Sequence, residues 1–384
     1  MVAAVRRGLA LRRAAEKFGV ALATVQFWVA RAGTQRLDRV DFSNRPRGPR
    51  RPANRSTRGL EDLVLTLRRE LKETSDLGEF GAAAIHRALQ ARRIDDLPSV
   101  RTIGRILERW GALDGRKRVR RLAPPTGWDL PDVGARRVEL DSLDIVEGLV
   151  IRGGIAVEVL NGISLPGGLV VSWPMATITA LATTQALIAH WRVVGLPAYA
   201  QFDNDTIFQG PHQHADVVGR VMRLCLSLGL VPVFAPPRET GFQAAIENFN
   251  GRWQAKVWAR FEYDSLNSVQ AQSGKFVAAS RQRAAARIEA APARRPFPKR
   301  WKLDLQAQPR GRIIFLRRTS AQGIVELLGH RFEVDVSWPH RLVRAEVDLD
   351  AGRIRFFALR RREPNHQPLL REVAYTLPRR RFQE

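Results

Sequence analysis

Three acidic residues each adjoin a segment with a recognisable pattern. Asp141 ends the β-patterned stretch Val138-Glu-Leu-Asp, Asp203 follows the apolar run 197–202, and Glu247 lies in a helix-like segment. Carboxylates that converge from separate elements suit Mg²⁺ or Mn²⁺, which prefer oxygen ligands. Two such ions about 3.5–4 Å apart can activate an oxygen nucleophile and stabilise a leaving oxygen in phosphoryl transfer. Ordinary surface acids are the alternative interpretation.

The segments around these acids predict the elements that position them. In order, they are strands 138–145, 154–160 and 168–173, helix 177–194, strand 197–202, helix 214–228, strand 230–234 and helix 241–261. Three strands at hairpin spacing, followed by alternating helices and strands, predict a mixed sheet flanked by helices. This β-β-β-α-β-α-β-α order is an RNase H-like α/β layout, which we expect over residues 132–265.

The helix that carries Glu247 has its own start signal and two faces. Thr240-Gly-Phe-Gln243 has the form of a capping box, which places Glu247 in the second turn. Apolar residues recur every three or four positions and predict a buried stripe: Ile246, Phe249, Trp253, Val257 and Phe261. A basic row suits phosphate binding, with a solvated charged face as the alternative: Arg252, Lys256 and Arg260.

The first strand offers two acids, Asp141 and Asp144. Because they are three positions apart, a strand points their side chains to opposite faces, and only one can face the metal pocket. We expect Asp141, because Asp144 lies nearer to a hairpin predicted at Glu147-Gly148.

Two segments carry a family resemblance. Asp203-Asn-Asp-Thr-Ile-Phe208 is similar to the D-N-G-x-x-F motif of the retroviral-integrase-like DDE transposases, with Asp205 where that family has Gly. The segment 245–253 (Ala-Ile-Glu-Asn-Phe-Asn-Gly-Arg-Trp) resembles their third motif, and Asp141 is the counterpart of their first acid. The resemblance covers roughly residues 135–262, and the flanking segments fit bacterial insertion-sequence transposases.

The resemblance implies a function. Asp141, Asp203 and Glu247 would be the catalytic residues and the ligands of two Mg²⁺ or Mn²⁺ ions, with Asp141 bridging them. The chain would bind the terminal inverted repeats of its element as a homo-multimer, cleave them and join the ends to target DNA. It would work in the prokaryotic cytoplasm with the nucleoid. A catalytically inactive DNA-binding descendant and a nuclease without strand transfer are the alternatives.

Composition restricts the partners. Lys and Arg number 63 against 38 Asp and Glu, a net charge of +25, which favours nucleic acid over a membrane surface as partner. The single Cys225 excludes an intrachain disulfide framework and predicts a reducing compartment. Residues 159–191 lack charges, but Pro and Gly interrupt them, which favours buried strands and a packed helix over a membrane span.

Two helical units precede the core. Residues 1–35 have a helix-turn-helix pattern in which Ala15 allows close helix approach, Gly19 permits the turn and Val25 anchors the second helix. The candidates for the major groove there are Thr24, Gln26, Phe27 and Arg31. A basic linker is expected over 36–58. The segment 59–121 resembles the winged-helix-type unit of the same transposases, with these residues outward: Arg101, Thr102 and Arg105. A plain helical hairpin and a helical spacer are the alternatives.

The C-terminal third is expected to be separate from the core. Residues 266–305 predict a basic helical linker. Five short strands at roughly ten-residue spacing over 310–360 predict a small SH3-like β-barrel, serving as a DNA or partner surface or as a purely structural part. A basic tail, 361–384, follows.

Overall fold

The computed structural model describes residues 1–44, 56–94, 96–113, 127–211, 214–237, 239, 241–361 and 363–383. The chain divides into two compact units, Met1–Asp62 and Leu63–Glu384. Much of the predicted basic linker and the end of the predicted second helical unit lie outside the described residues. No helix in the described ranges combines the length and apolar character that a membrane crossing requires.

The first unit contains three short helices, α1 (Val2–Arg6), α2 (Leu11–Phe18) and α3 (Leu22–Ala32), and a single turn η1 (Leu37–Arg39). Gly19 ends α2 in the left-handed conformation, with φ 62°, so the predicted turn is present. Ala14, and not the predicted Ala15, is the buried alanine between the helices, where it lies with Val25.

The second unit begins with three helices, α4 (Arg58–Thr74), α5 (Ala82–Ala91) and α6 (Val100–Arg109). They enclose an apolar cluster that includes Leu67, Ile85, Ile103 and Leu107. Ser99 caps α6 by accepting a hydrogen bond from the Thr102 N–H, as a good N-cap should. The described residues of 59–113 form no strand. Within them, the helices of the predicted winged-helix-type unit are present, but the β-hairpin wing is not.

A mixed sheet follows, preceded by the short helix α7 (Pro131–Gly134). Its first five strands are β1 (Leu140–Ile151), β2 (Ile155–Leu165), β3 (Val170–Met175), β4 (Tyr199–Phe202) and β5 (Val231–Phe234). β1, β2 and β3 pair antiparallel in sequence, and β1, β4 and β5 pair parallel. The mixed sheet and the strand positions therefore confirm the predicted order.

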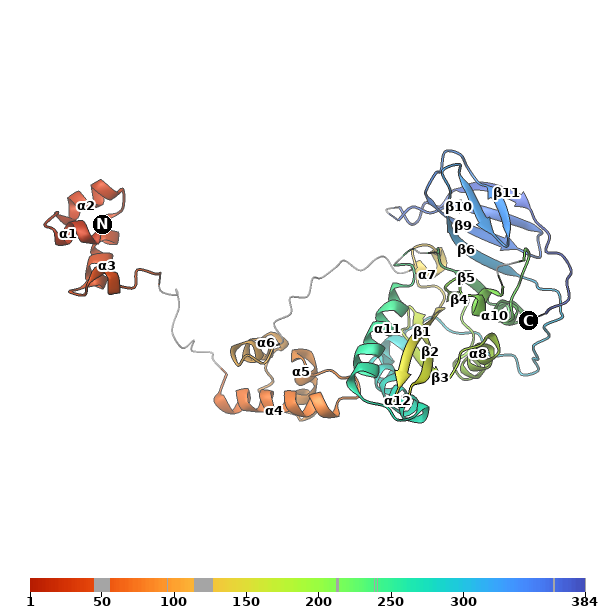
Figure 1. The fold of residues 1–384 in the computed structure, drawn as a ribbon, viewed down its shortest axis with the longest axis horizontal. Helices are drawn as coiled ribbons and strands as arrows, with labels where there is room; N and C mark the ends of the chain where they lie inside the picture. The colour runs from red at the N-terminus through yellow and green to blue at the C-terminus, as the bar shows by residue number, and fades with distance from the viewer. Residues whose placement is uncertain are drawn as a thin grey trace. The chain divides into compact units, whose positions relative to one another are not determined.

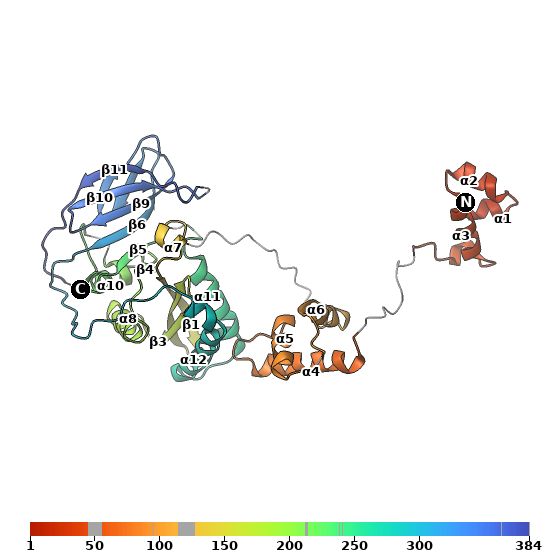
Figure 2. The ribbon, with the colours of Figure 1, turned by 180° about the vertical axis from the view of Figure 1, so that it is seen from behind.

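Helices cover both faces of these strands (Figures 1 and 2). The helices are α8 (Ala180–Val194), α9 (Thr206–Gln209), α10 (Arg220–Ser227), α11 (Ala244–Lys256) with the turn η2 (Trp258–Arg260), and α12 (Leu266–Arg283). Leu143 of β1 joins the apolar cluster of α8 and α10, whereas Val146 joins that of α11 and α12. Alternate residues of β1 therefore face different helices, as the two-residue period of a strand requires.

The segment predicted as a basic linker is part of the core. α12 buries Val269 and Phe276 against the sheet. Ser273 accepts a hydrogen bond of 2.9 Å from the Trp253 indole of α11 and lies 2.8 Å from Ser172 of β3. The short helix α13 (Ala285–Glu289) follows. Residues 266–283 therefore pack as a layer on the sheet.

The C-terminal strands also differ from the prediction. They are β6 (Arg312–Arg318), β7 (Ile324–Leu327), β8 (His330–Glu333), β9 (Leu342–Asp348), β10 (Arg353–Ala358) and β11 (Leu369–Ala374). The expected strands exist, but β6 pairs parallel with β5, and the nine-stranded order is β11-β10-β9-β6-β5-β4-β1-β2-β3. The predicted closed barrel is not confirmed, because three of its five strands, β6, β9 and β10, extend the core sheet, while β7 and β8 pair only with each other. β11 lies in the segment predicted as a basic tail.

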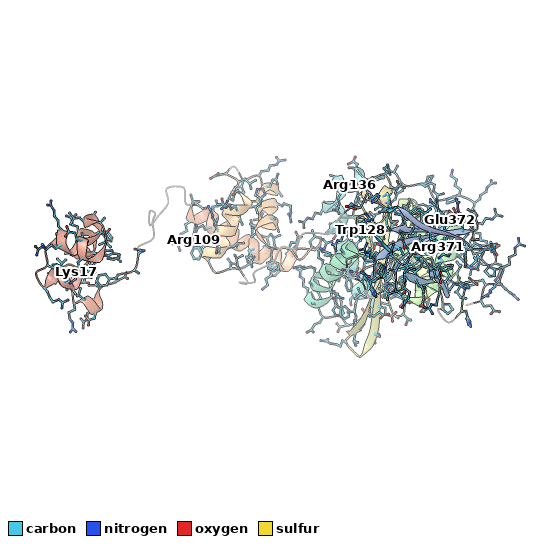
Figure 3. The ribbon with its side chains drawn as sticks, turned by 90° about the horizontal axis from the view of Figure 1, so that it is seen from above. Lys17, Arg109, Trp128, Arg136, Arg371 and Glu372 are labelled. Atoms are coloured by element: carbon cyan, nitrogen blue, oxygen red, sulfur yellow. The ribbon has the colours of Figure 1, made fainter. Side chains whose placement is uncertain are left out.

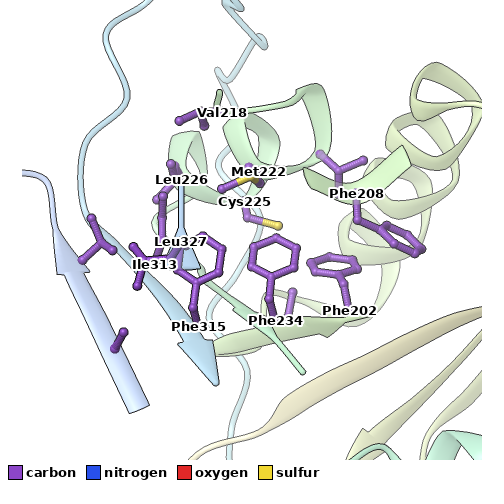
Figure 4. Packing of buried hydrophobic residues seen from close by; sticks show 14 of the residues in the cluster. Phe202, Phe208, Val218, Met222, Cys225, Leu226, Phe234, Ile313, Phe315 and Leu327 are labelled. Atoms are coloured by element: carbon purple, nitrogen blue, oxygen red, sulfur yellow. The ribbon is translucent and has the colours of Figure 1, made fainter. Parts of the chain in front are cut away.

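Aromatic packing shows why the sheet continues (Figure 4). Phe202 of β4, Phe234 of β5 and Phe315 of β6 follow one another, with ring centroids 6.0 and 5.2 Å apart. All three rings are buried. An apolar strand with both faces buried needs neighbours on both sides, so β6 is an interior strand.

Candidate active site

The parallel pairing of β1 with β4 determines which acids lie close together. Ser142 pairs with Gln201, so the same register carried two residues further brings Asp144 level with Asp203. Asp144 also has the parity of Val146, which faces α11. Because α11 carries Glu247, the acids from three elements meet on this face of the sheet.

Asp141 lies on the opposite face and has a different environment. Its carboxylate accepts hydrogen bonds from the Arg294 guanidinium at 2.5 and 3.1 Å and from the Trp191 indole of α8 at 2.9 Å. Arg294 also pairs with Glu139 at 2.6 Å, and all three charged side chains are buried. The prediction that Asp141 faces the pocket of Asp203 and Glu247 is therefore wrong in this structure.

Asp144 is held by a chain of two amides. The Asn250 side chain donates to the Asp144 carboxylate at 2.7 Å, and Asn161 of β2 donates to the Asn250 carbonyl at 2.8 Å. Asn250 stands three residues after Glu247 on α11, where side chains share a helix face. The same helix that presents the third acid thus orients the first.

The motif after β4 forms a compact turn. The Asp203 carboxylate accepts the Asp205 N–H at 3.0 Å, and Asp205 caps α9 by accepting the Ile207 N–H at 2.7 Å. The Asn204 amide donates to the Ala235 carbonyl at 2.6 Å. Phe208 is buried, and its ring centroid lies 4.8 Å from that of Phe202. Asp205 therefore has a local role as helix cap.

Glu247 lies in the first turn of α11 and is exposed. The helix begins at Ala244, and its N-cap Gln243 makes no side-chain capping bond, so the predicted capping box does not start it. Thr240 lies outside the described residues. The Glu247 carboxylate accepts a long bond of 3.5 Å from the Gly241 N–H. The loop before α11 thus engages this acid.

The electrostatics connect the three acids. Burial, together with the negative charges of Asp203 and Glu247, raises the pKa of Asp144 to about 6, while the Asn250 bond opposes that rise. Burial also raises the pKa of Asp203, with further contributions from Asp205 and Glu147. Like charges near one buried group are the condition that a bound cation relieves.

The donor set consists only of carboxylate oxygens, which suits Mg²⁺ or Mn²⁺. Among the residues that the structure describes, no group of three or more His, Cys, Asp or Glu side chains is arranged to hold a metal ion. Asp144 lies in β1 and Asp203 directly follows β4, whereas the Glu247 carboxylate accepts the Gly241 N–H from the loop before α11. The described residues thus present the three acids without assembling them into a metal site.

Sequence reasoning placed Asp144 second to Asp141 and did not name Asn250. The end predicted for the first strand explains the choice of Asp141. Glu147 and Gly148 form a bulge within β1 instead of the predicted hairpin, because the register with β2 shifts between Val146 and Leu149. Gly148 has φ +74°, the left-handed conformation typical of such bulges. The strand continues to Ile151, so Asp144 lies in its interior.

The predicted basic row on α11 has two different environments. Lys256 donates to the Gly78 carbonyl at 3.0 Å, and Arg260 donates to the carbonyls of Lys72 and Glu73 at 2.9 and 2.8 Å. These bonds satisfy the C-terminal end of α4 and the loop after it. Arg252 remains exposed, with its guanidinium 5.8 Å from the Phe249 ring.

The predicted groove-facing residues of α3 also divide. Gln26 and Phe27 are exposed, and Thr24 is half-buried. Arg31 instead pairs with Asp41 at 3.2 Å and stacks on Trp28 at 5.1 Å. Only part of the predicted set therefore faces solvent.

On α6, Arg101 and Arg105 are exposed, whereas the Thr102 hydroxyl lies 2.9 Å from the Ser99 hydroxyl. Basic side chains project elsewhere too, for example at Lys17 and Arg371 (Figure 3).

No protein-family model matches the chain, and no curated protein matches it. Solved structures similar to it include the simian T-cell lymphotropic virus intasome in complex with PP2A regulatory subunit B56 gamma. That match has 12% identity and a TM-score of 0.32, over 72% of this chain and 88% of the other. The BIV integrase catalytic core has 16% identity and a TM-score of 0.28, over 36% and 81%. The HTLV-2 integrase catalytic core in complex with magnesium has 14% identity and a TM-score of 0.27, over 40% and 87%.

Proposed function

We propose that the chain is a DDE-type polynucleotidyl transferase of the bacterial insertion-sequence type, with an RNase H-like core. Its catalytic acids would be Asp144, Asp203 and Glu247. The observation that carries the proposal is the register of β1 with β4, which brings Asp144 level with Asp203 on the face that α11 covers. The net charge of +25 supports DNA as the substrate.

The chain's own residues prepare the site. Mg²⁺ or Mn²⁺, when bound as one or two ions, supplies positive charge that lowers the barrier to phosphoryl transfer. Asn250 holds the Asp144 carboxylate in one orientation, and the Asp205 N–H holds that of Asp203. Glu247 has to turn away from Gly241 to join them.

The same proposal includes binding of the element's terminal inverted repeats as a homo-multimer, cleavage there, and strand transfer into target DNA. Exposed residues of the helical units are the candidate contacts: Gln26 and Phe27 on α3, Arg101 and Arg105 on α6. Work on chromosomal DNA would place the protein with the nucleoid of a prokaryotic cell.

A nicking assay tests the activity. The purified full chain, incubated with supercoiled DNA and Mg²⁺ or Mn²⁺, should produce nicks that EDTA prevents. Glu247→Gln should lose this activity, and Glu262→Gln, which alters an exposed acid paired with Arg152, should keep it. Equal nicking by wild type and Glu247→Gln would reject the assignment of this acid.

The second candidate function is DNA binding without catalysis by an inactive descendant. Asp205, in place of the family's Gly, is the feature that favours it. In the structure Asp205 caps α9 and leaves the Asp203 backbone in place, so the substitution has a structural explanation. Tight DNA binding with no metal-dependent nicking under any condition would favour this second function.

A further inference from the structure

A cavity of about 400 Å³ lies on another side of α11, apart from the three acids. It is formed by α11, the C-terminal part of α12, the turn between β2 and β3, and the segment after α4. Apolar side chains line part of it, among them Ile163, Val170 and Phe276. Its basic residues are Arg252, Lys256, Arg283 and Arg287, and its one acid is Glu79.

The four basic side chains differ in how many hydrogen bonds and ion pairs they make within the protein. Arg283 pairs with Glu79, Lys256 donates to a backbone carbonyl, and Arg287 donates to the Gly167 carbonyl at 2.8 Å. Arg252 makes no hydrogen bond or ion pair with any residue that the structure describes. Partial desolvation of this exposed side chain, followed by the charge of Arg283, lowers the pKa of Arg252; the charge of Glu79 opposes the shift and that of Arg287 adds to it. Positive charge therefore accumulates here beyond what the protein neutralises.

The turn between β2 and β3 is shaped to admit one of these cations. A Cβ at Gly168 would lie 1.6 Å from a guanidinium nitrogen of Arg287. Gly168 also has φ +77°, which disfavours any other residue. The glycine thus permits Arg287 to cross the turn at the cavity wall.

A buried hydroxyl completes the lining. Ser280 of α12 is 9% exposed, and its Oγ has no hydrogen-bond partner within the described part of the chain. A buried donor without a partner costs free energy that an acceptor in the cavity would recover. Arginine forks and a hydroxyl are groups that bind phosphate oxygens.

We propose that this cavity binds a backbone phosphate of DNA, with Arg252 and Ser280 donating to its oxygens and the apolar wall contacting the attached sugar. The inference rests on the proposed function for its choice of DNA. Arg252 follows Glu247 by five residues, roughly 7.5 Å along the helix and about 140° around it. The bound phosphate is therefore not the one that the acids attack, and the cavity holds DNA flanking the reaction.

Binding measurements on the full chain test this inference. We would measure the affinity for a fluorescent duplex by anisotropy in EDTA, across a potassium chloride series. Arg252→Gln should reduce the slope of log affinity against log salt by about 0.9, the loss of one phosphate contact. Ser280→Ala should weaken binding by about tenfold without changing the slope. Arg331→Gln, an exposed arginine of β8, is the matched control and should leave the slope at the wild-type value.

The outcomes separate the possibilities. Slopes and affinities of both cavity variants equal to those of Arg331→Gln would overturn the inference. Affinity for inorganic phosphate that Arg252→Gln and Ser280→Ala lower, beside DNA affinities and slopes that match those of Arg331→Gln, would indicate a free-anion site and also overturn it. Binding that depends on Arg252 and Ser280 in a chain that never nicks DNA would support the cavity and reject the proposed activity.

Discussion

The two sides of β1 carry carboxylates only three residues apart, with opposite environments. Asp141 is buried with an indole donor and with a bidentate arginine that it shares with Glu139, so its charge is paired. Burial of Asp144, together with the negative charges of Asp203 and Glu247, raises its pKa to about 6, although the Asn250 amide donates to it. A compensated carboxylate stabilises a fold, whereas an uncompensated group of carboxylates is typical of a site that awaits a ligand.

The largest expected difference between Asp141 and Asp144 is in catalysis. Asp144→Asn should reduce metal-dependent nicking by about a thousandfold or more, because a lost ligand removes several kcal/mol of transition-state stabilisation. Asp141→Asn should retain activity within a few-fold per folded molecule. Parallel nicking assays on both folded variants measure this. An active Asp144→Asn beside an inactive, folded Asp141→Asn would reverse the assignment.

The next effect is on stability and runs in the opposite direction. Asp141→Asn should lower the free energy of unfolding by about 3–5 kcal/mol, because it leaves the buried Arg294 without one of its carboxylates. Urea unfolding of this variant and of Asp144→Asn, which should not be destabilised, measures the contrast. The double variant Asp141→Asn with Arg294→Gln should lose less than the sum of the single losses, because the two groups interact. Strict additivity would contradict the pairing.

A smaller effect concerns the amide that orients Asp144. Asn250→Ala should reduce nicking by about 10–100-fold, the usual cost of removing a group that orients a metal ligand. It should also weaken the apparent affinity for Mn²⁺. Gln254→Ala, an exposed neighbour on the same helix, is the control and should behave as wild type. Loss of activity at unchanged Mn²⁺ affinity would argue against a positioning role.

The smallest effect is a pH dependence. The raised pKa of Asp144 means that its contribution to folding stability is present below the ordinary value of 3.8 and is lost as pH rises through about 6. Without metal, the stability of wild type should therefore fall relative to Asp144→Asn across this window. Saturating Mg²⁺ should diminish the difference at pH 7. Unfolding titrations of both proteins at several pH values measure it, and parallel curves would contradict the cause assigned to the shift. Asp129, whose pKa is also raised to about 6, is common to both proteins and cancels.

Much of the core followed from local pattern. The predicted strands and helices between 138 and 261 occur in the expected order, because each buries a face of simple period, although β1 continues to Ile151 and the helix predicted over 214–228 covers only Arg220–Ser227. The turn from Asp203 to Phe208 was recognisable because its acid, its cap and its buried ring are consecutive. The two-residue period of a strand also predicted correctly that Asp141 and Asp144 face opposite sides of the sheet. Parity carries no information about which side α11 covers, since that depends on tertiary packing.

The errors in the C-terminal third also arise because local sequence pattern does not specify tertiary contacts. Strands over 310–360 were predictable, but their partners were not, because the pairing of Ile314 with Val233 joins segments 81 residues apart. The basic row on α11 was likewise predicted to bind phosphates, with a solvated charged face as the alternative, although Arg260 satisfies the carbonyl groups at the end of α4. Sequence periodicity shows which face of an element is polar. It does not show whether that face meets water, nucleic acid or another part of the chain.

The extension of the sheet makes β11 an edge strand. With β6, β9, β10 and β11 added, the last strand in the order is β11, and a bare edge of this kind is a template for pairing with other chains. Its exposed residues include Arg371, which pairs with Glu333, and Glu372, which pairs with Arg353; both are labelled in Figure 3. Charged edges oppose strand-to-strand aggregation. Substituting both by Val would therefore be expected to lower solubility before it altered any reaction at the acids.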